Sequence, residues 1–418
     1  MIDPALVRTR FPALASAAVF LDNPGGTQIA QPALDRMRDY LEHTNANHGG
    51  AFRTSRASDA LVQAAREAAA DFLGAARPEE IIFGANMTTL TFHMSRTLCR
   101  RLGPGDEIIV TRLDHDANIA PWVLAAQDRE VVVRWVGFDS RDCTLDMDDL
   151  ARQISARTRI LALGYASNAV GTINDVARAA EWAHRVGALC YVDAVHYAPH
   201  GPIEVGALGC DLLVCSAYKF FGPHLGLLYG RHDLLESLAA YKVRPASDEP
   251  PHKFETGTGN FEAIAGLVGT LEYLEWLGER FGTEYEEGFA GTLTGRRLRL
   301  RTALAAIRAF EIDLGRYLIE RLQAVPGLTI YGIQESARLD RRVPTVSFTL
   351  EGHSPRAVAE YLGQAEIYAW DGNYYALEVT TRLGLEASGG MVRVGPVHYN
   401  TRAEIDQLGD ALEALSRT

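Results

Sequence analysis

Asp193 and Lys219 carry the two side chains of this sequence whose chemistry combines most directly, a carboxylate and an amine. Asp193 ends a short apolar run that begins near Val186, and Lys219 follows a second run that begins at Asp211. Both runs are too short for helices, and glycine or polar residues bound them, so they are predicted to be buried parallel strands. Ligands bind beyond the carboxyl ends of such strands. Pyridoxal phosphate (PLP) takes a lysine as its Schiff base and an acidic partner on its pyridine nitrogen, so the pair predicts a PLP site.

The segment around Lys219 has hydroxyl side chains before the lysine and glycines after it. Residues 216–226 read Ser-Ala-Tyr-Lys-Phe-Phe-Gly-Pro-His-Leu-Gly, which resembles the lysine motif of fold-type I PLP enzymes of the class V aminotransferase and cysteine desulfurase group. The resemblance extends from about Phe20 to Asn400. It implies an α/β fold with a mostly parallel, seven-stranded sheet in a large PLP-binding domain (residues 20–290). A smaller α+β C-terminal domain (291–418) follows, and an N-terminal segment (1–19) packs with that small domain.

The composition is that of an ordinary globular protein. The chain has 418 residues, 47% of them hydrophobic and 22% charged, which is enough to bury a large core in two domains. A net charge of -12 without a basic patch argues against a nucleic-acid or anionic-membrane partner. The five cysteines lack metal-site spacing, so no metal site is predicted. No apolar run of about 18 residues and no signal-type N-terminus is found, so we expect a cytoplasmic protein.

Residues 81–89 indicate an anion site, because a strand there runs through a small polar turn into a helix whose first N–H groups face outward. The turn resembles the phosphate loop of the desulfurases, which implies that Asn86, Met87 and Thr88 contact the PLP phosphate. The same resemblance assigns phosphate contacts to Ser216 and Tyr218, although the family has histidine where Tyr218 stands.

Three further residues follow predicted strands and resemble family positions around the PLP ring. His115 stands in Asp-His-Asp-Ala-Asn-Ile-Ala-Pro-Trp, where the matching family histidine stacks on the pyridine ring. Its imidazole is also suited to moving protons. The resemblance implies that Asn168 and His196 contact the phenolate oxygen of PLP. It also implies that Asp193 keeps the pyridine nitrogen protonated, and that Lys219 becomes the general base once substrate displaces it.

The expected substrate site is drawn from both ends of the chain. Arg393, in a segment that resembles the family pattern before Tyr399-Asn400-Thr401, is expected to bind the substrate carboxylate bidentately. The turn at Gly25 and Gly26 is expected to border that carboxylate. The remaining substrate contacts that the resemblance implies are Asn168 together with His48, Arg53, Trp370, Asn373 and Tyr374. As an alternative, His48 and Arg53 belong to a solvated loop between helices.

Thr258 lies in Phe-Glu-Thr-Gly-Thr-Gly-Asn (254–260), which resembles a family loop that reaches the PLP phosphate of a second subunit. The resemblance therefore implies a homodimer in which the Thr258 loop completes the partner's site.

The sequence departs from the desulfurases where those enzymes carry their nucleophilic cysteine. Tyr375 stands at that position, and no cysteine follows Cys215. Persulfide formation requires a thiolate. We therefore expect a PLP-dependent enzyme that acts on a small L-amino acid whose amine displaces Lys219. The expected outcome is lyase-type, Cβ–S cleavage or β-decarboxylation, without a persulfide cysteine.

Other outcomes stay open at the level of sequence. The alternatives are cleavage of a C–S or C–Se bond in cysteine or selenocysteine, decarboxylative aldol-type C–C bond formation on aspartate, and class V transamination. A binding module without catalysis is disfavoured because both Lys219 and Asp193 are present.

Overall fold

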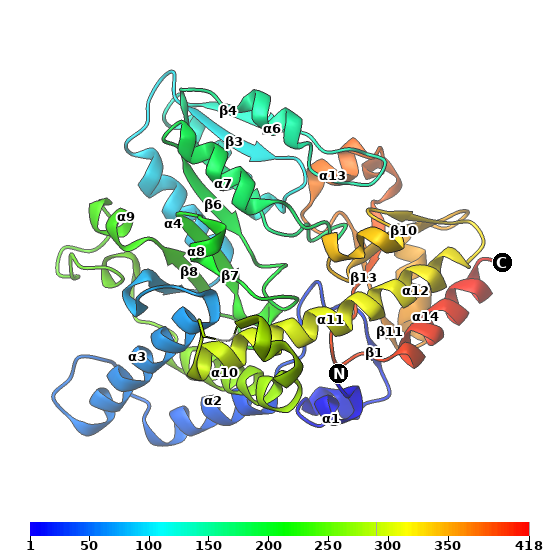
Figure 1. The fold of residues 1–418 in the computed structure, drawn as a ribbon, viewed down its shortest axis with the longest axis horizontal. Coiled ribbons are helices and arrows are strands. Elements are labelled where there is room, and N and C mark those ends of the chain that lie inside the picture. The colour runs from blue at the N-terminus through cyan, green and yellow to red at the C-terminus, as the bar shows by residue number, and fades with distance from the viewer. Residues whose placement is uncertain (290, 418) are drawn as a thin grey trace.

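In the computed structural model, which describes residues 1–289 and 291–417, a seven-stranded sheet forms the centre of the molecule (Figure 1). Its order is β2-β8-β7-β6-β5-β3-β4, and only β8 runs opposite to the other six strands. The predicted mostly parallel, seven-stranded sheet is thereby confirmed. The strands are β2 (Ile81–Gly84), β3 (Glu107–Thr111), β4 (Val132–Val136), β5 (Thr158–Gly164), β6 (Leu189–Asp193), β7 (Leu212–Ser216) and β8 (Gly226–Gly230).

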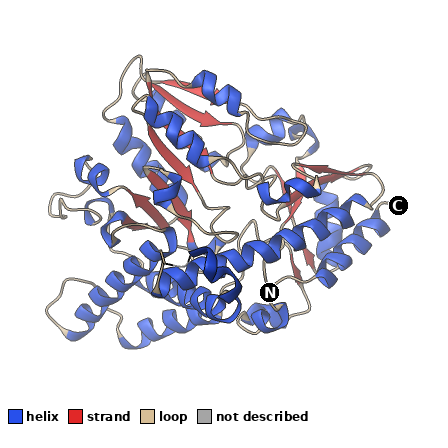
Figure 2. Ribbon diagram, in the orientation of Figure 1, coloured by secondary structure: helices blue, strands red, loops and turns tan. Residues whose placement is uncertain are grey.

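Helices cover both faces of this sheet, which explains why its central strands are mostly apolar and buried (Figure 2). Apolar side chains of α4, α5 and α9 pack on one face, and those of α3, α7, α10 and the first half of α11 pack on the other. The helices are α1 (Pro4–Arg8), α2 (Gln31–His43), α3 (Arg53–Leu73), α4 (Met87–Cys99), α5 (Ala120–Gln127), α6 (Met147–Gln153), α7 (Val176–Arg185), α8 (Val205–Leu208), α9 (His232–Ser237), α10 (Phe261–Phe281), α11 (Gly295–Gln323), α12 (Pro355–Gln364), α13 (Leu377–Arg382) and α14 (Arg402–Leu415).

The carboxyl ends of β2, β3, β5, β6 and β7 meet at one edge of the sheet, because these strands all point the same way. β6 ends at Asp193, and β7 ends at Ser216, where the short 3₁₀ turn η4 (Ala217–Lys219) begins. The first apolar run becomes a strand only at Leu189. Gly187 takes a positive φ of 76° there and separates α7 from β6.

A second, antiparallel sheet lies beside the first and has the order β12-β13-β10-β9. Its strands are β9 (Leu328–Tyr331), β10 (Val346–Leu350), β12 (Trp370–Gly372) and β13 (Met391–Val394), and β1 (Val19–Phe20) pairs separately with β11 (Ile367–Tyr368). Helices α12, α14 and the second half of α11 close its core. This α+β part agrees with the predicted fold class.

Helix α11 connects the two cores and crosses the molecule in Figure 1. Leu304 packs in the large core and Leu318 in the small one. Residue 290, the predicted end of the large domain, lies outside the described residues. The domain limits therefore stay a prediction. The N-terminal segment contacts both parts, because Phe11 packs in the large core while Arg8 pairs with Glu404 of α14 at 2.8 Å.

The helices within residues 1–289 and 291–417 include none that combines the length and the apolar character needed to cross a membrane.

Candidate active site

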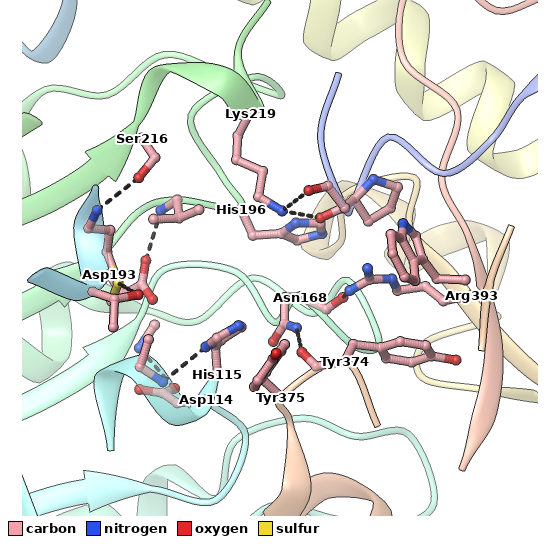
Figure 3. Close-up of a pocket in the computed structure, with 18 of the residues that line it drawn as sticks. Asp114, His115, Asn168, Asp193, His196, Ser216, Lys219, Tyr374, Tyr375 and Arg393 are labelled. Carbon is pink, nitrogen blue, oxygen red and sulfur yellow. Dashed lines mark hydrogen bonds between the residues drawn. The ribbon is translucent and has the colours of Figure 1, made fainter. Parts of the chain in front are cut away.

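A cavity of about 440 Å³ opens at the carboxyl edge of the large sheet, where the small domain faces it (Figure 3). Side chains from both domains line it. The predicted site residues that it brings together are Gly25, Asn86, Met87, Thr88, His115, Asn168, Asp193, His196, Ser216, Tyr218, Lys219, Trp370, Asn373, Tyr374 and Arg393.

Lys219 enters the cavity from η4, and its Nζ donates to the backbone carbonyl oxygens of Pro24 and Gly25, the latter at 3.0 Å. Burial lowers the pKa of Lys219 to about 7, and the positive charge of Arg393 acts in the same direction. A substantial fraction of the amine is therefore uncharged, and hence nucleophilic, near neutral pH.

The chain has only two other lysines, and both are bound elsewhere. Lys242 donates to the carbonyl oxygen of Ala246, and Lys253 donates to the carbonyl oxygens of Glu236 and Leu238. Lys219 is thus the one lysine that lines the cavity.

Asp193 lies buried at the end of β6, and one of its carboxylate oxygens accepts the backbone N–H of Val195 at 2.9 Å. Burial raises the pKa of Asp193 to about 7, and the neighbouring carboxylate of Asp114 adds to the rise. A cation placed against it in the cavity would lower this pKa and favour the ionised carboxylate. In Figure 3, Lys219 reaches between Asp193 on one side and Arg393 on the other.

His115 is held by its neighbours as a neutral ring. Its Nδ1 accepts the backbone N–H of Ala117 at 2.9 Å, so the ring proton belongs on Nε2. Burial, together with the charges of Lys219 and Arg393, lowers the pKa of His115 to about 4. The ring stacks on Tyr375 with centroids 5.4 Å apart.

Asp114 fixes the turn that carries His115. Its carboxylate accepts from Thr111 Oγ1 at 2.7 Å, from Asn118 Nδ2 at 2.8 Å and from the backbone N–H of Gly164 at 2.9 Å. These contacts tie the end of β3 to the end of β5 and thereby position the imidazole.

The first turn of α4 is clamped at the edge of the sheet. Ser216 Oγ accepts the backbone N–H of Met87 at 3.0 Å, and the Asn86 side chain caps the helix by accepting from Thr89 N at 2.9 Å. A Cβ at Gly226 would lie 2.6 Å from the Asn86 backbone, so glycine is needed for this close approach. Helix N-termini of this kind bind phosphate.

Arg393 lies buried in β13 and crosses to the large domain. Its Nη1 donates to the carbonyl oxygen of Asn168 at 2.8 Å, and its guanidinium lies 4.3 Å from the centre of the Tyr374 ring. Within residues 1–289 and 291–417 its buried Nε has no hydrogen-bond partner. Burial lowers the pKa of Arg393 to about 10, so the side chain is cationic at neutral pH and has a donor free for a carboxylate.

The turn that follows β12 is strained and tightly held. Tyr374 and Tyr375 both have positive φ angles, 53° and 59°, which non-glycine residues rarely adopt. Asn168 Nδ2 donates to the carbonyl oxygen of Tyr374 at 2.9 Å, and the backbone N–H of Asp116 donates to that of Tyr375 at 2.7 Å. The turn thereby presents the exposed Tyr375 ring at the cavity mouth.

His196 and Tyr218 complete the wall of the cavity. His196 Nε2 lies 2.9 Å from Thr345 Oγ1, which belongs to the small domain. The Tyr218 ring stacks on His224 with centroids 4.8 Å apart.

Four predicted site residues do not line the cavity. Gly26 lies just behind it, where a Cβ would be 3.2 Å from the Tyr218 ring. His48 and Arg53 are exposed, with the His48 ring 5.9 Å from that of Phe261. Thr258 is exposed in the loop that precedes α10. His48, Arg53 and Thr258 thus lie on surface segments outside the cavity.

Sequence reasoning did not select several residues that line the cavity. For Asp114 and Tyr375 a signal was present, since each adjoins a selected residue. Val195 was not selected, because the sequence does not show which residues just beyond a strand point into a cavity. The other unselected lining residues are Pro24, Ala117, Gly164, Ala166 and Gly372.

Comparisons with known proteins agree with this geometry. The family model described as Aminotransferase class-V matches residues 19–296 and 280–408. The chain is 35% identical to the Aminotransferase-like protein FGM3 of Gibberella zeae, over 98% of this chain and 97% of that protein. It is 31% identical to a probable cysteine desulfurase of Mycolicibacterium paratuberculosis over 97% of this chain, which spans 57% of that longer protein.

Among solved structures, the apo cysteine desulfurase of Thermococcus onnurineus NA1 matches with a TM-score of 0.87 and 26% identity, over 100% of this chain and 99% of that one. The fold, the cavity and the sequence thus lead to one family: the chain belongs to the class V aminotransferases, the group of PLP-dependent enzymes that includes the cysteine desulfurases.

Proposed function

We propose that the chain is a PLP-dependent enzyme that acts on a small L-amino acid and releases a group from its β-carbon without a persulfide cysteine. The observation that carries this proposal is the convergence of Lys219, Asp193 and Arg393 in one cavity that no cysteine lines.

The unsatisfied groups of the cavity fit PLP and an amino acid. Asp193 has a raised pKa because it is buried, and a protonated pyridine nitrogen would place a positive charge against it. The buried Oδ1 of Asn168 and Nε of Arg393 have no hydrogen-bond partner in the part of the chain that the structure describes. The first turn of α4 lines the cavity with Asn86, Met87 and Thr88, and the N-terminus of a helix attracts a phosphate. When bound, PLP supplies a carbonyl for amines and an electron sink for the substrate α-carbon.

Each residue then has a definite task. Arg393 binds the substrate carboxylate, because it is buried, cationic and has a free donor. Asp193, 7% exposed, would hold the pyridine nitrogen in its protonated form. Lys219, with its lowered pKa, takes a proton from the substrate near neutral pH and returns it. The neutral His115 would lie against the cofactor ring and would keep bulk water from that face.

The thiols of the chain support a route without persulfide. All five cysteines are buried. Burial raises the pKa of Cys99 and Cys210 to about 12, and it raises those of Cys190 and Cys215 as well. A thiolate is the nucleophilic form, so none of these thiols is suited to accept sulfur.

Leaving groups that depart as neutral molecules need no thiolate acceptor. Aspartate would lose CO₂ from Cβ and take up one proton there to give alanine. Cysteine sulfinate would lose SO₂ and leave alanine, the proton again being placed on Cβ.

The second candidate function is transamination. Similarity to a protein named aminotransferase-like favours it, at 35% identity. Against it, Arg393 is the only arginine among the described lining residues, and a second guanidinium that would bind a dicarboxylate partner is absent from that set.

We also propose a homodimer in which Thr258 completes the phosphate site of the partner subunit. Thr258 is exposed and lies outside its own cavity, on a loop whose Glu255 pairs with the buried Arg66 and accepts from Phe83 N at 2.8 Å. A mixture of Lys219→Ala and Thr258→Asp chains tests this arrangement. Shared sites predict that mixing restores activity that neither variant has alone, whereas independent sites predict no recovery.

Product analysis by mass spectrometry tests the proposed reaction. The holoenzyme is incubated with cysteine, cysteine sulfinate and aspartate, with and without an aldehyde, beside the Lys219→Ala variant. Catalytic alanine formation that is lost in the variant supports the proposal. A 2-oxo acid formed with stoichiometric conversion of the cofactor to its amine form replaces it with transamination, and a γ-hydroxy amino acid replaces it with decarboxylative aldol chemistry.

A further inference from the structure

The indole of Trp370 lies so close to Gly25 that the space available at one position depends on the residue at the other. A Cβ built on Gly25 would lie 2.2 Å from the indole Nε1 of Trp370, and its three nearest atoms all belong to that indole. The φ of Gly25 is not in the left-handed region. The space occupied by Trp370 is therefore what requires glycine here, rather than the backbone conformation.

The indole stands between the two groups that would hold an amino acid. Trp370 is the register partner of Arg393 across β12 and β13, and partners in an antiparallel pair project from the same face. On the other side, the carbonyl oxygen of Gly25 accepts a hydrogen bond from Lys219 Nζ at 3.0 Å. The carboxylate of a substrate on Arg393 and its amine near Lys219 therefore place the rest of the substrate beside this indole.

The protein covers about half of the Trp370 side chain. Trp370 is 51% exposed, and both Trp370 and Gly25 line the cavity. The contact with Gly25 thus forms a wall of the cavity whose other side faces the substrate space.

We propose that Trp370 and Gly25 are a matched pair that determines which amino-acid side chains the enzyme accepts. The inference rests on the proposed function, because it takes Arg393 and Lys219 as the groups that hold the substrate. The indole narrows the space next to the α-carbon and excludes long unbranched side chains. Gly25 lets the Nε1 edge of the indole approach the backbone, so a side chain at position 25 displaces the indole.

A double-mutant cycle tests the pair. The variants are Gly25→Ala, Trp370→Ala and the double variant, with Gly103→Ala as the matched control because a Cβ there meets no atom within 4 Å. The probes are L-alanine, L-2-aminobutyrate, L-norvaline and L-norleucine. Dissociation constants for the holoenzyme are measured by the absorbance change of the cofactor and by quenching of tryptophan fluorescence, so the result does not depend on turnover.

The proposal expects affinity in the wild type to fall by at least about tenfold from alanine to norleucine, and expects Trp370→Ala to remove most of this fall. Gly25→Ala is expected to change the ratio of the norleucine and alanine dissociation constants by about tenfold when Trp370 is present. In the Trp370→Ala background the same substitution should change this ratio by less than about threefold. Gly103→Ala should retain the wild-type profile.

Equal effects of Gly25→Ala in both backgrounds, or an unchanged length profile in Trp370→Ala, would overturn the pairing while amino acids still bind. If none of the four amino acids changes the absorbance of the wild-type holoenzyme, the proposed function itself fails. The two failures are thereby distinguished.

Discussion

The Nη1 atom of Arg393 donates to the backbone carbonyl oxygen of Asn168 at 2.8 Å, and the bond joins residues 225 positions apart in the chain. One guanidinium nitrogen is fixed on the large domain in this way, while Nε is left without a partner among the described residues. A guanidinium has enough N–H donors to bind a backbone carbonyl and a substrate carboxylate at the same time. An ammonium is a point charge and lacks this planar arrangement of donors.

Arg393→Lys should therefore weaken substrate binding despite keeping the charge. We expect KM for the substrate amino acid to rise about 10- to 100-fold, which corresponds to one or two charge-assisted hydrogen bonds. Steady-state kinetics measure the change. The exposed Arg141, which pairs with Asp139, gives the matched control Arg141→Lys, with kinetics like the wild type. An unchanged KM in Arg393→Lys would place the carboxylate elsewhere.

Lys219 should be the single site at which borohydride attaches the cofactor to the chain. Of the three lysines, only Lys219 lines the cavity and has a pKa lowered to about 7. We expect the added pyridoxyl mass on the peptide that contains Lys219 after digestion. Lys219→Ala should lose the label and at least about 100-fold in turnover. A label on Lys242 or Lys253 would contradict the assignment.

Asp193→Asn should stabilise the cofactor-free protein near neutral pH. The pKa of Asp193 is raised to about 7 in the folded state, above its ordinary value of 3.8, so the native state binds more protons between these pH values. Stability from this group is therefore complete below about pH 4 and is lost as the pH rises to about 7.

Urea unfolding of both proteins at pH 4, 5.5 and 7 measures this difference. The variant should gain a few kcal/mol over the wild type at pH 7, with the gain shrinking toward pH 4. A gain that is the same at all three pH values would show that the carboxylate is not the cause.

Tyr375→Gly should separate stability from activity. Glycine relieves a φ of 59° that costs a non-glycine residue about 1 kcal/mol, so the melting temperature should stay equal or rise. Activity should fall about tenfold or more, because the ring that stacks on His115 is lost. The exposed Glu130, with a φ of 56°, provides the control Glu130→Gly, in which stability should respond similarly without loss of activity.

Iodoacetamide should leave the native holoenzyme active. All five thiols are buried, and burial raises the pKa of Cys99 and Cys143 to about 12, far above the pH of the reaction. Intact-mass analysis should show no alkylation until the protein is unfolded. Rapid inactivation together with a single alkylated cysteine would contradict this prediction and would support a mechanism that uses a thiol.

The sequence by itself determined the parallel sheet and its chemically active edge. Short apolar runs that end at Asp193 and Ser216 can be read as buried strands without any knowledge of contacts, because both faces of such strands are covered. The motif around Lys219 and the position of Arg393 near the C-terminus were likewise visible in the sequence.

Only the tertiary structure decided how distant segments meet. Gly25 reads as a turn residue in the sequence, yet the indole of Trp370 lies against it. The neutral state of His115 depends on burial and on charges from Lys219 and Arg393, which lie far away in the chain. Contacts between remote segments and the loss of water around buried charges leave no local pattern, and for that reason these features became visible only in the folded chain.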